Sequence, residues 1–255
     1  KSIISPQILT PLTPALYQTS TPAKNLQPFA VSNNPMSKLS FFSKIVRPFS
    51  SLRATATSTS SDVVSDDIAD VLGDISIFTA AGESVKFSDL WDQNEGVAVV
   101  ALMRHFGCFC SWDFAASLRE SKERFEAAGV KLIAVGVGSP DNAQLFAERL
   151  PFPLDSLYAD PERKAYDAMG LYFGLRRTFL SPTSAKVFSR WGEVKKNMKN
   201  YTLKATPDDR SSVLQQGGML VFKGKQLLYA MKEEGPGDHA SLDKIFEICS
   251  KVSIA

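Results

Sequence analysis

The chain has 255 residues, of which 44% are hydrophobic and 22% charged, so it carries enough apolar material for a folded core. The longest uninterrupted apolar run, residues 97–103, is far shorter than the about 20 residues that a membrane-spanning helix needs, which excludes a membrane-spanning protein. Three cysteines are too few for a secreted domain held together by disulfides.

Charge is distributed unevenly along the chain. Residues 1–61 contain six basic residues, no acidic residue and 19 Ser or Thr, a composition typical of an organelle transit peptide. The many hydroxyl residues and few arginines favour the chloroplast over the mitochondrion; the alternative is a disordered tail on a cytosolic protein. Residues 62–255 hold 23 basic and 27 acidic residues, which disfavours nucleic acid as a partner. We therefore expect a disordered transit peptide over 1–61 and one folded domain over 62–255.

Predicted strands and helices alternate from residue 62 onward. Alternation at 75–78 predicts a first strand, and the run 97–103 predicts a strand covered on both faces. Apolar residues at helical spacing predict a helix at 112–128. The other expected elements are strands at 84–87, 131–137, 157–159, 218–222 and 226–231, and helices at 88–91, 142–150, from 160, and from 238 or 241 to about 252. This order indicates an α/β domain with a mixed sheet of roughly five to seven strands.

Two cysteines lie where the buried strand passes into the long helix. Cys108 and Cys110 precede the first turn of that helix, whose free N–H groups and positive dipole end stabilise a thiolate. Arg104 and His105 add positive charge nearby in the sequence. The alternative is that both cysteines are small apolar residues at a strand end, but their clustering in a loop favours redox chemistry.

The segment Arg104-His105-Phe106-Gly107-Cys108 resembles the peroxiredoxin-like proteins of the AhpC/TSA antioxidant group in the thioredoxin superfamily. The similarity covers about residues 73–252 and includes 134–138, 158–161 and 215–218. The resemblance implies a thioredoxin-like fold, with a central mixed β-sheet flanked by helices on both faces, and Cys108 as the attacking cysteine. It also implies a peroxide or disulfide substrate, thioredoxin or glutathione as reductant, no bound cofactor and, from the plastid members, a place in the chloroplast stroma.

The chain departs from the family pattern in two places. The usual motif is Cys-x-x-Cys, whereas Ser111 stands three residues after Cys108. Two helical residues separated by two positions lie about 160° apart, so Cys110 would point away from Cys108 if both were helical. Typical peroxiredoxins also place Pro and Thr ahead of the attacking cysteine, where this chain has residues 103–107, Met-Arg-His-Phe-Gly. The role of Cys110 in reducing oxidised Cys108 therefore stays open.

Together these observations predict a chloroplast thiol oxidoreductase. Cys108 would be the thiolate, Arg104 would stabilise it, and Cys110 or an external thiol would reduce the oxidised form. The alternative is a catalytically weak thioredoxin-fold protein that senses redox state or binds a partner. We expect Cys249 to be a packing residue of the last helix and His239 to be a cap or surface residue. Two cysteines spaced by one residue and two distant histidines do not predict a metal site.

Overall fold

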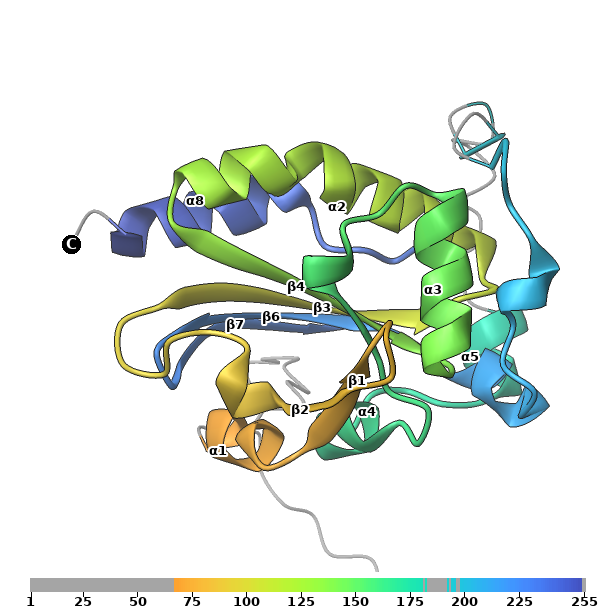
Figure 1. Cartoon of the computed structure of the whole chain (residues 1–255), viewed down its shortest axis with the longest axis horizontal. Helices are drawn as coiled ribbons and strands as arrows, with labels where there is room; N and C mark the ends of the chain where they lie inside the picture. Colours follow the sequence, from red (N-terminus) through yellow and green to blue (C-terminus); the bar gives the residue numbers. More distant parts are fainter. Residues whose placement is uncertain (1–66, 181, 183–191, 193, 196–197, 254–255) are drawn as a thin grey trace, which may run out of the picture. The chain divides into compact units, whose positions relative to one another are not determined.

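A computed structural model describes residues 67–180, 182, 192, 194–195 and 198–253 (Figure 1). The expected transit peptide, residues 1–61, lies outside the described residues. The strands are β1 (Ser76–Thr79), β2 (Ser84–Lys86), β3 (Val97–His105), β4 (Val130–Val137), β5 (Leu157–Ala159), β6 (Gly218–Lys223) and β7 (Gln226–Lys232). The α-helices are α1 (Ile68–Gly73), α2 (Phe109–Ala127), α3 (Pro140–Arg149), α4 (Lys164–Ala168), α5 (Leu175–Phe179) and α8 (Leu242–Ser253). Short 3-10 helices are η1 (Phe87–Asp89), η2 (Leu154–Ser156), η3 (Leu203–Ala205) and η4 (Arg210–Leu214).

The seven strands form one mixed sheet in the order β2-β1-β5-β4-β3-β6-β7. Strand β3 pairs in parallel with β4, and β4 in parallel with β5, while β6 and β7 form an antiparallel hairpin beside β3. The sheet and its helices confirm the predicted α/β class. Within the described residues, no helix is long and apolar enough to cross a membrane.

Strand β3 lies at the centre of the fold and is covered on both faces. All nine of its residues are buried, as expected from its continuous apolar run. Alternate side chains divide between two core clusters: Val99 packs in the cluster that includes residues of α2, α3 and α8, and Val100 in the cluster that includes residues of α1 and α4. Figure 1 shows α2, α3 and α8 over one face of the sheet and α1 and α4 over the other.

The boundary between β3 and α2 differs from the sequence prediction. The strand continues through Arg104 to His105, because the backbone of His105 still pairs with Val137 of β4 although the apolar run has ended. Helix α2 begins at Phe109 instead of Trp112. Both shifts shorten the predicted loop and place Cys108 at the N-cap of α2.

The helix expected from residue 160 also begins later, at Lys164. Asp160 nevertheless satisfies amides of the first turn, since its carboxylate accepts hydrogen bonds from the N–H groups of Lys164 at 3.1 Å and Ala165 at 2.9 Å. Helix α3 is capped by Ser139, whose hydroxyl accepts from the N–H of Asn142 in a reciprocal capping box. These caps fix the connections on the side of the sheet where β3, β4 and β5 end.

Candidate active site

The candidate site begins where β3 passes into α2. The N–H of Cys108 donates to the carbonyl of His105 at 2.9 Å, which closes a tight turn after the strand. Cys108 itself has extended backbone (φ −85°, ψ 123°), and its carbonyl accepts the first helical hydrogen bond from the N–H of Trp112. The thiol of Cys108 therefore sits at the positive end of a helix of 19 residues.

Gly107 allows this turn to pack closely against Thr206. A Cβ atom at this position would lie 2.0 Å from Thr206 Oγ1 and 2.7 Å from the Thr206 backbone nitrogen, so a larger residue would push the two segments apart. The Gly107 carbonyl accepts a hydrogen bond from the Tyr201 hydroxyl at 2.7 Å. The Phe106 carbonyl accepts one from Trp112 Nε1 at 2.6 Å. These contacts hold the turn in one conformation.

Arg104 joins the strand to the thiol of Cys108. Its side chain is buried, and Nη1 donates to Cys108 Sγ at 3.0 Å. Its remaining nitrogens are fixed by backbone carbonyls, Nε by Gln215 at 3.0 Å and Nη2 by Val213 at 2.6 Å. The planar guanidinium is thus held from three directions with its charge directed at the sulfur. The structure brings Arg104 and Cys108 together as the sequence predicted.

The two cysteines of this loop form one thiol–thiolate pair. A hydrogen bond from the thiol of Cys110, together with the charge of Arg104, holds the pKa of Cys108 well below its ordinary value despite burial. The same hydrogen bond, with burial, raises the pKa of Cys110. Both thiols are free and buried. Cys108 is accordingly the more acidic thiol of the pair, and Cys110 the less acidic one.

The helical-wheel expectation for Cys110 does not apply to this pair. That argument applies only if both residues are helical, whereas Cys108 is the extended N-cap and Cys110 lies in the first turn. The positive charge expected at His105 is also corrected, since burial lowers the pKa of this imidazole and favours its neutral form. Arg104 is the larger of the two charges that lower the pKa of Cys108, and His105 contributes less.

Side chains from a distant segment cover the two thiols. Cys108 and Cys110 form a small buried cluster with Val194, and Met198 packs against it. Tyr201 lies beside them, and burial, with the charges of the two cysteines, raises the pKa of its hydroxyl to about 12. Cys108 is only 5% exposed under this cover. The described residues therefore leave Cys108 little direct contact with solvent.

A second buried polar pair, formed by Glu233 and His239, was missed in the sequence. His239 Nδ1 lies 2.7 Å from Glu233 Oε1, and the imidazole stacks on Phe114 of α2 with 4.2 Å between the ring centroids. His239 is thus half-buried, with 13% of its side chain exposed and its Nε2 buried, so it is more enclosed than its prediction as a cap or surface residue. Neither residue belongs to a motif, and only the fold brings them beside α2.

Two other predicted positions lie as follows. Ser111, where the family motif has its second cysteine, is buried, and its hydroxyl has no hydrogen-bond partner among the described residues. Cys249 is fully buried on α8 in the main core cluster, as predicted for a packing residue. In the described part of the chain, no group of three or more His, Cys, Asp and Glu side chains is arranged to hold a metal ion.

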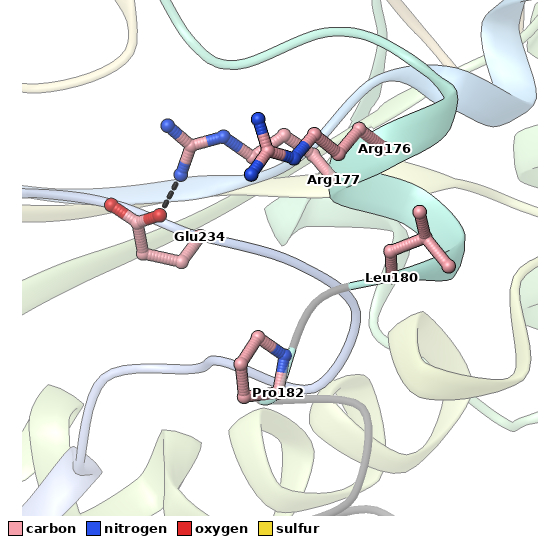
Figure 2. Close-up of a pocket in the computed structure, with 5 residues that line it drawn as sticks. All are labelled: Arg176, Arg177, Leu180, Pro182 and Glu234. Atoms are coloured by element: carbon pink, nitrogen blue, oxygen red, sulfur yellow. Dashed lines mark ion pairs between the residues drawn. The ribbon is translucent and has the colours of Figure 1, made fainter.

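The described surface holds several open pockets, two of which bear on the site. One, of about 530 Å³, is lined in part by Thr206 and Val213. Because Thr206 lies against Gly107 and the Val213 carbonyl accepts from Arg104, this pocket adjoins the cysteine loop. The other, of about 350 Å³, is lined by Arg176, Arg177, Leu180, Pro182 and Glu234. Figure 2 shows Arg177 paired with Glu234 across the second pocket, which contains neither cysteine.

Comparisons with known proteins place the chain among related sequences. A family model described as AhpC/TSA antioxidant enzyme matches residues 117–235, a range that begins beyond both loop cysteines. The chloroplastic thioredoxin-like protein AAED1 of Arabidopsis thaliana is 34% identical over 184 residues, covering 71% of this chain and 72% of that protein. The prostamide/prostaglandin F synthase of Aquarana catesbeiana is 30% identical over 174 residues, covering 64% of this chain and 78% of that protein.

Among solved structures, the bacterioferritin comigratory protein of Xanthomonas campestris superposes with a TM-score of 0.49 at 12% identity, over 72% of this chain and 95% of that one. The extent and identity of the sequence match to the Arabidopsis protein decide the assignment. This chain belongs to the AhpC/TSA family of thioredoxin-like, peroxiredoxin-like proteins, whose function is thiol-dependent redox chemistry.

Proposed function

We propose that this protein is a chloroplast thiol peroxidase whose attacking group is the Cys108 thiolate. The observation that carries the proposal is the contact of Arg104 Nη1 with Cys108 Sγ at 3.0 Å, beside the proton-bearing thiol of Cys110. A stabilised thiolate is the nucleophile that peroxide reduction needs.

The first step forms a sulfenic acid at Cys108. The thiolate attacks one peroxide oxygen, the O–O bond breaks, and the departing oxygen takes a proton and leaves as water or an alcohol. In the second step Cys110 attacks the oxidised sulfur, which forms an S–S bond and releases water. An external dithiol such as thioredoxin, or glutathione, then reduces the disulfide. The hydrogen-bonded contact between the two thiols supports Cys110 as the second cysteine despite the serine at position 111.

The alternative is a redox sensor or partner-binding protein with weak turnover. The burial of both thiols under Val194 and Met198 favours this alternative, because a substrate has little direct access to them. A turnover assay separates the two functions. The reduced protein is supplied with hydrogen peroxide or an alkyl hydroperoxide, together with a thioredoxin or glutathione regenerating system.

Sustained consumption of peroxide, with sulfenic acid or disulfide located at Cys108 by mass spectrometry, would support the peroxidase. A single oxidation without turnover would support the sensor. The same spectra report whether Cys110 or an added thiol occupies the bond to Cys108.

We also propose import into the chloroplast stroma and removal of roughly the first fifty to sixty residues. The chloroplastic relative and the six basic residues without an acidic counterpart over 1–61 support this proposal. A fluorescent fusion of residues 1–61 should enter chloroplasts, and a fusion that stays in the cytosol would contradict it. A second fusion, in which acidic residues replace the six basic ones, serves as the control.

A further inference from the structure

The buried pair Glu233 and His239 is not used by the chemistry described so far. Glu233 is 3% exposed, and its Oε2 has no hydrogen-bond partner among the described residues; the same holds for His239 Nε2. The hydrogen bond between His239 Nδ1 and the carboxylate favours the tautomer with its proton on Nδ1. Nε2 is then the buried ring nitrogen at which the imidazole gains or loses a proton.

The pair lies against the same part of α2 as Cys110. His239 stacks on Phe114, and Phe114 follows Cys110 by four residues, so the two side chains lie on one face of the helix. Charge at Glu233 raises the pKa of Cys110, and the backbone of Cys110 lies near enough to the imidazole to raise the pKa of His239. Nε2 nevertheless completes no hydrogen bond of normal geometry.

The second step of the proposed cycle creates a need for a base at this place. Cys110 holds its proton in the resting pair, and burial opposes its ionisation. Once Cys108 is a sulfenic acid, the sulfur that accepted the hydrogen bond is no longer an anion. The other groups that act on Cys110 are Arg104, which is not a base, and Glu233.

We propose that the Glu233–His239 pair accepts the proton of Cys110 and returns it to the departing oxygen. This inference rests on the proposed function and assigns its second step. Nε2 of His239 takes the proton, the Cys110 sulfur attacks Cys108, the S–S bond forms and the S–O bond breaks. The hydroxide that leaves receives the proton from His239, so one water is released and no further reagent is consumed.

The charges around the pair fit a base that becomes active after the first oxidation. Burial lowers the pKa of His239, whereas Glu233 and the Cys108 thiolate raise it, with the net shift upward. Loss of the thiolate charge on oxidation removes one raising contribution, which favours the neutral imidazole when it is needed. The other ionisable group that senses Glu233 is Tyr166 of α4, whose pKa is raised chiefly by burial and whose hydroxyl donates to backbone carbonyls.

The test measures the first and second steps separately in the full chain, Glu233→Gln, His239→Asn and the control Glu234→Gln. Glu234 is the neighbouring carboxylate, but it pairs with Arg177 at the surface. In one arm, hydrogen peroxide is added and sulfenic acid at Cys108 is trapped with dimedone while the loss of trapping follows disulfide formation. In the other, the aromatic disulfide DTNB replaces peroxide: attack by Cys108 releases a first nitrothiobenzoate, and closure by Cys110 a second.

Wild type and Glu234→Gln should complete both steps. Glu233→Gln and His239→Asn should still complete the first step, and should slow the second about a hundredfold more than the first near neutral pH. The wild-type second step should rise with pH as His239 loses its proton and then level off. In the two variants the rate of the second step should keep rising until Cys110 ionises without a base. The difference in rate between wild type and the variants should therefore shrink at alkaline pH. Circular dichroism checks that each variant is folded.

Equal second-step rates in all four proteins would overturn the inference, and so would a deficit that is independent of pH, which a merely structural role would give. If one variant fails to fold, the other carries the comparison. A wild type that completes both DTNB steps but forms no sulfenic acid would overturn the peroxidase proposal while the DTNB arm still decides the inference. A wild type that never releases the second nitrothiobenzoate would overturn the inference itself.

Discussion

Cys108 and Cys249 are both buried thiols associated with helices, with exposed fractions of 5% and 0%. Their pKa values are nevertheless shifted in opposite directions. Burial raises the pKa of Cys249 to about 11. The thiol of Cys110 and the charge of Arg104 lower the pKa of Cys108 in spite of burial. Burial therefore makes a thiol inert only when no group stabilises its anion.

The difference comes from where each residue stands on its helix. Cys249 lies within α8, where the backbone N–H groups are already bonded, and packs in the main core cluster with Ile245. Cys108 is the N-cap of α2, next to a strand end that supplies a buried arginine. A helix N-terminus and a fixed cation thus lower the pKa of a cysteine that would otherwise be only a packing residue.

The largest expected effect removes the core on which both thiols depend. Val99 of β3 is fully buried and lies opposite Leu132 and Val221 in the sheet. Val99→Asp buries an unpaired charge and should cost more than about 4 kcal/mol, which prevents folding and makes Cys249 as reactive as Cys108. Thermal melting and alkylation of each thiol measure this, with Ser84→Asp on exposed β2 as control. A variant that melts like the parent would contradict the burial of β3.

Cys108→Ser should abolish thiol-dependent turnover while leaving the fold intact. A serine hydroxyl is not a comparable nucleophile without an adjacent base, so peroxide consumption should fall to that of buffer alone. Cys249→Ser is the matched control and should keep full turnover. Retention of turnover by Cys108→Ser, at the same melting temperature, would show that another residue is the nucleophile.

Arg104→Gln should raise the pKa of Cys108 by removing the charge that faces its sulfur. At a pH below the pKa, each increase of the Cys108 pKa by one unit lowers the thiolate fraction about tenfold, and the rate of alkylation falls in proportion. In wild type, rapid alkylation of Cys108 should persist at pH values below the ordinary thiol pKa and decline only as the pH falls through the lowered value. The stability that the folded state gains from this thiolate is present above the ordinary pKa and is lost over the same descent.

The measurement is the pH profile of iodoacetamide labelling, read for each cysteine by mass spectrometry. Arg177→Gln, which removes a surface arginine paired with Glu234, serves as control and should leave the profile unchanged. Arg104→Lys should restore part of the reactivity, because it keeps the charge but not the three-way hydrogen bonding. An unchanged profile in Arg104→Gln would mean that Cys110 and the helix terminus alone stabilise the thiolate.

The sequence predicted the part of the site that is local. Arg104, Cys108 and Cys110 lie within seven positions, and the turn between a strand and a helix brings them close, although distant carbonyls of Gln215 and Val213 fix the Arg104 side chain. The exact boundaries were less predictable. Apolar periodicity ends at Met103 although the strand continues, and Cys108 is not among the residues that usually mark an N-cap.

The distant part of the site could not be predicted in the same way. Tyr201 and Thr206 lie in the stretch 171–212, which has no regular apolar pattern, yet both contact Gly107. Glu233 and His239 follow the last strand at a spacing that matches no motif. Their burial depends on α8 and α2 closing over the same face of the sheet, which is a property of the tertiary structure.

The smallest expected effect is that of Cys249→Ala. This change removes one buried sulfur from the core cluster and should lower the free energy of unfolding by about 1 kcal/mol through the cavity it leaves. Because Cys249 makes no contribution to the thiol pair, the labelling profile of Cys108 and the rate of peroxide consumption should not change. Chemical denaturation and the turnover assay measure the two quantities on one preparation. Loss of turnover without loss of stability, or oxidation of Cys249 in the folded wild type, would mean that its inertness does not follow from burial.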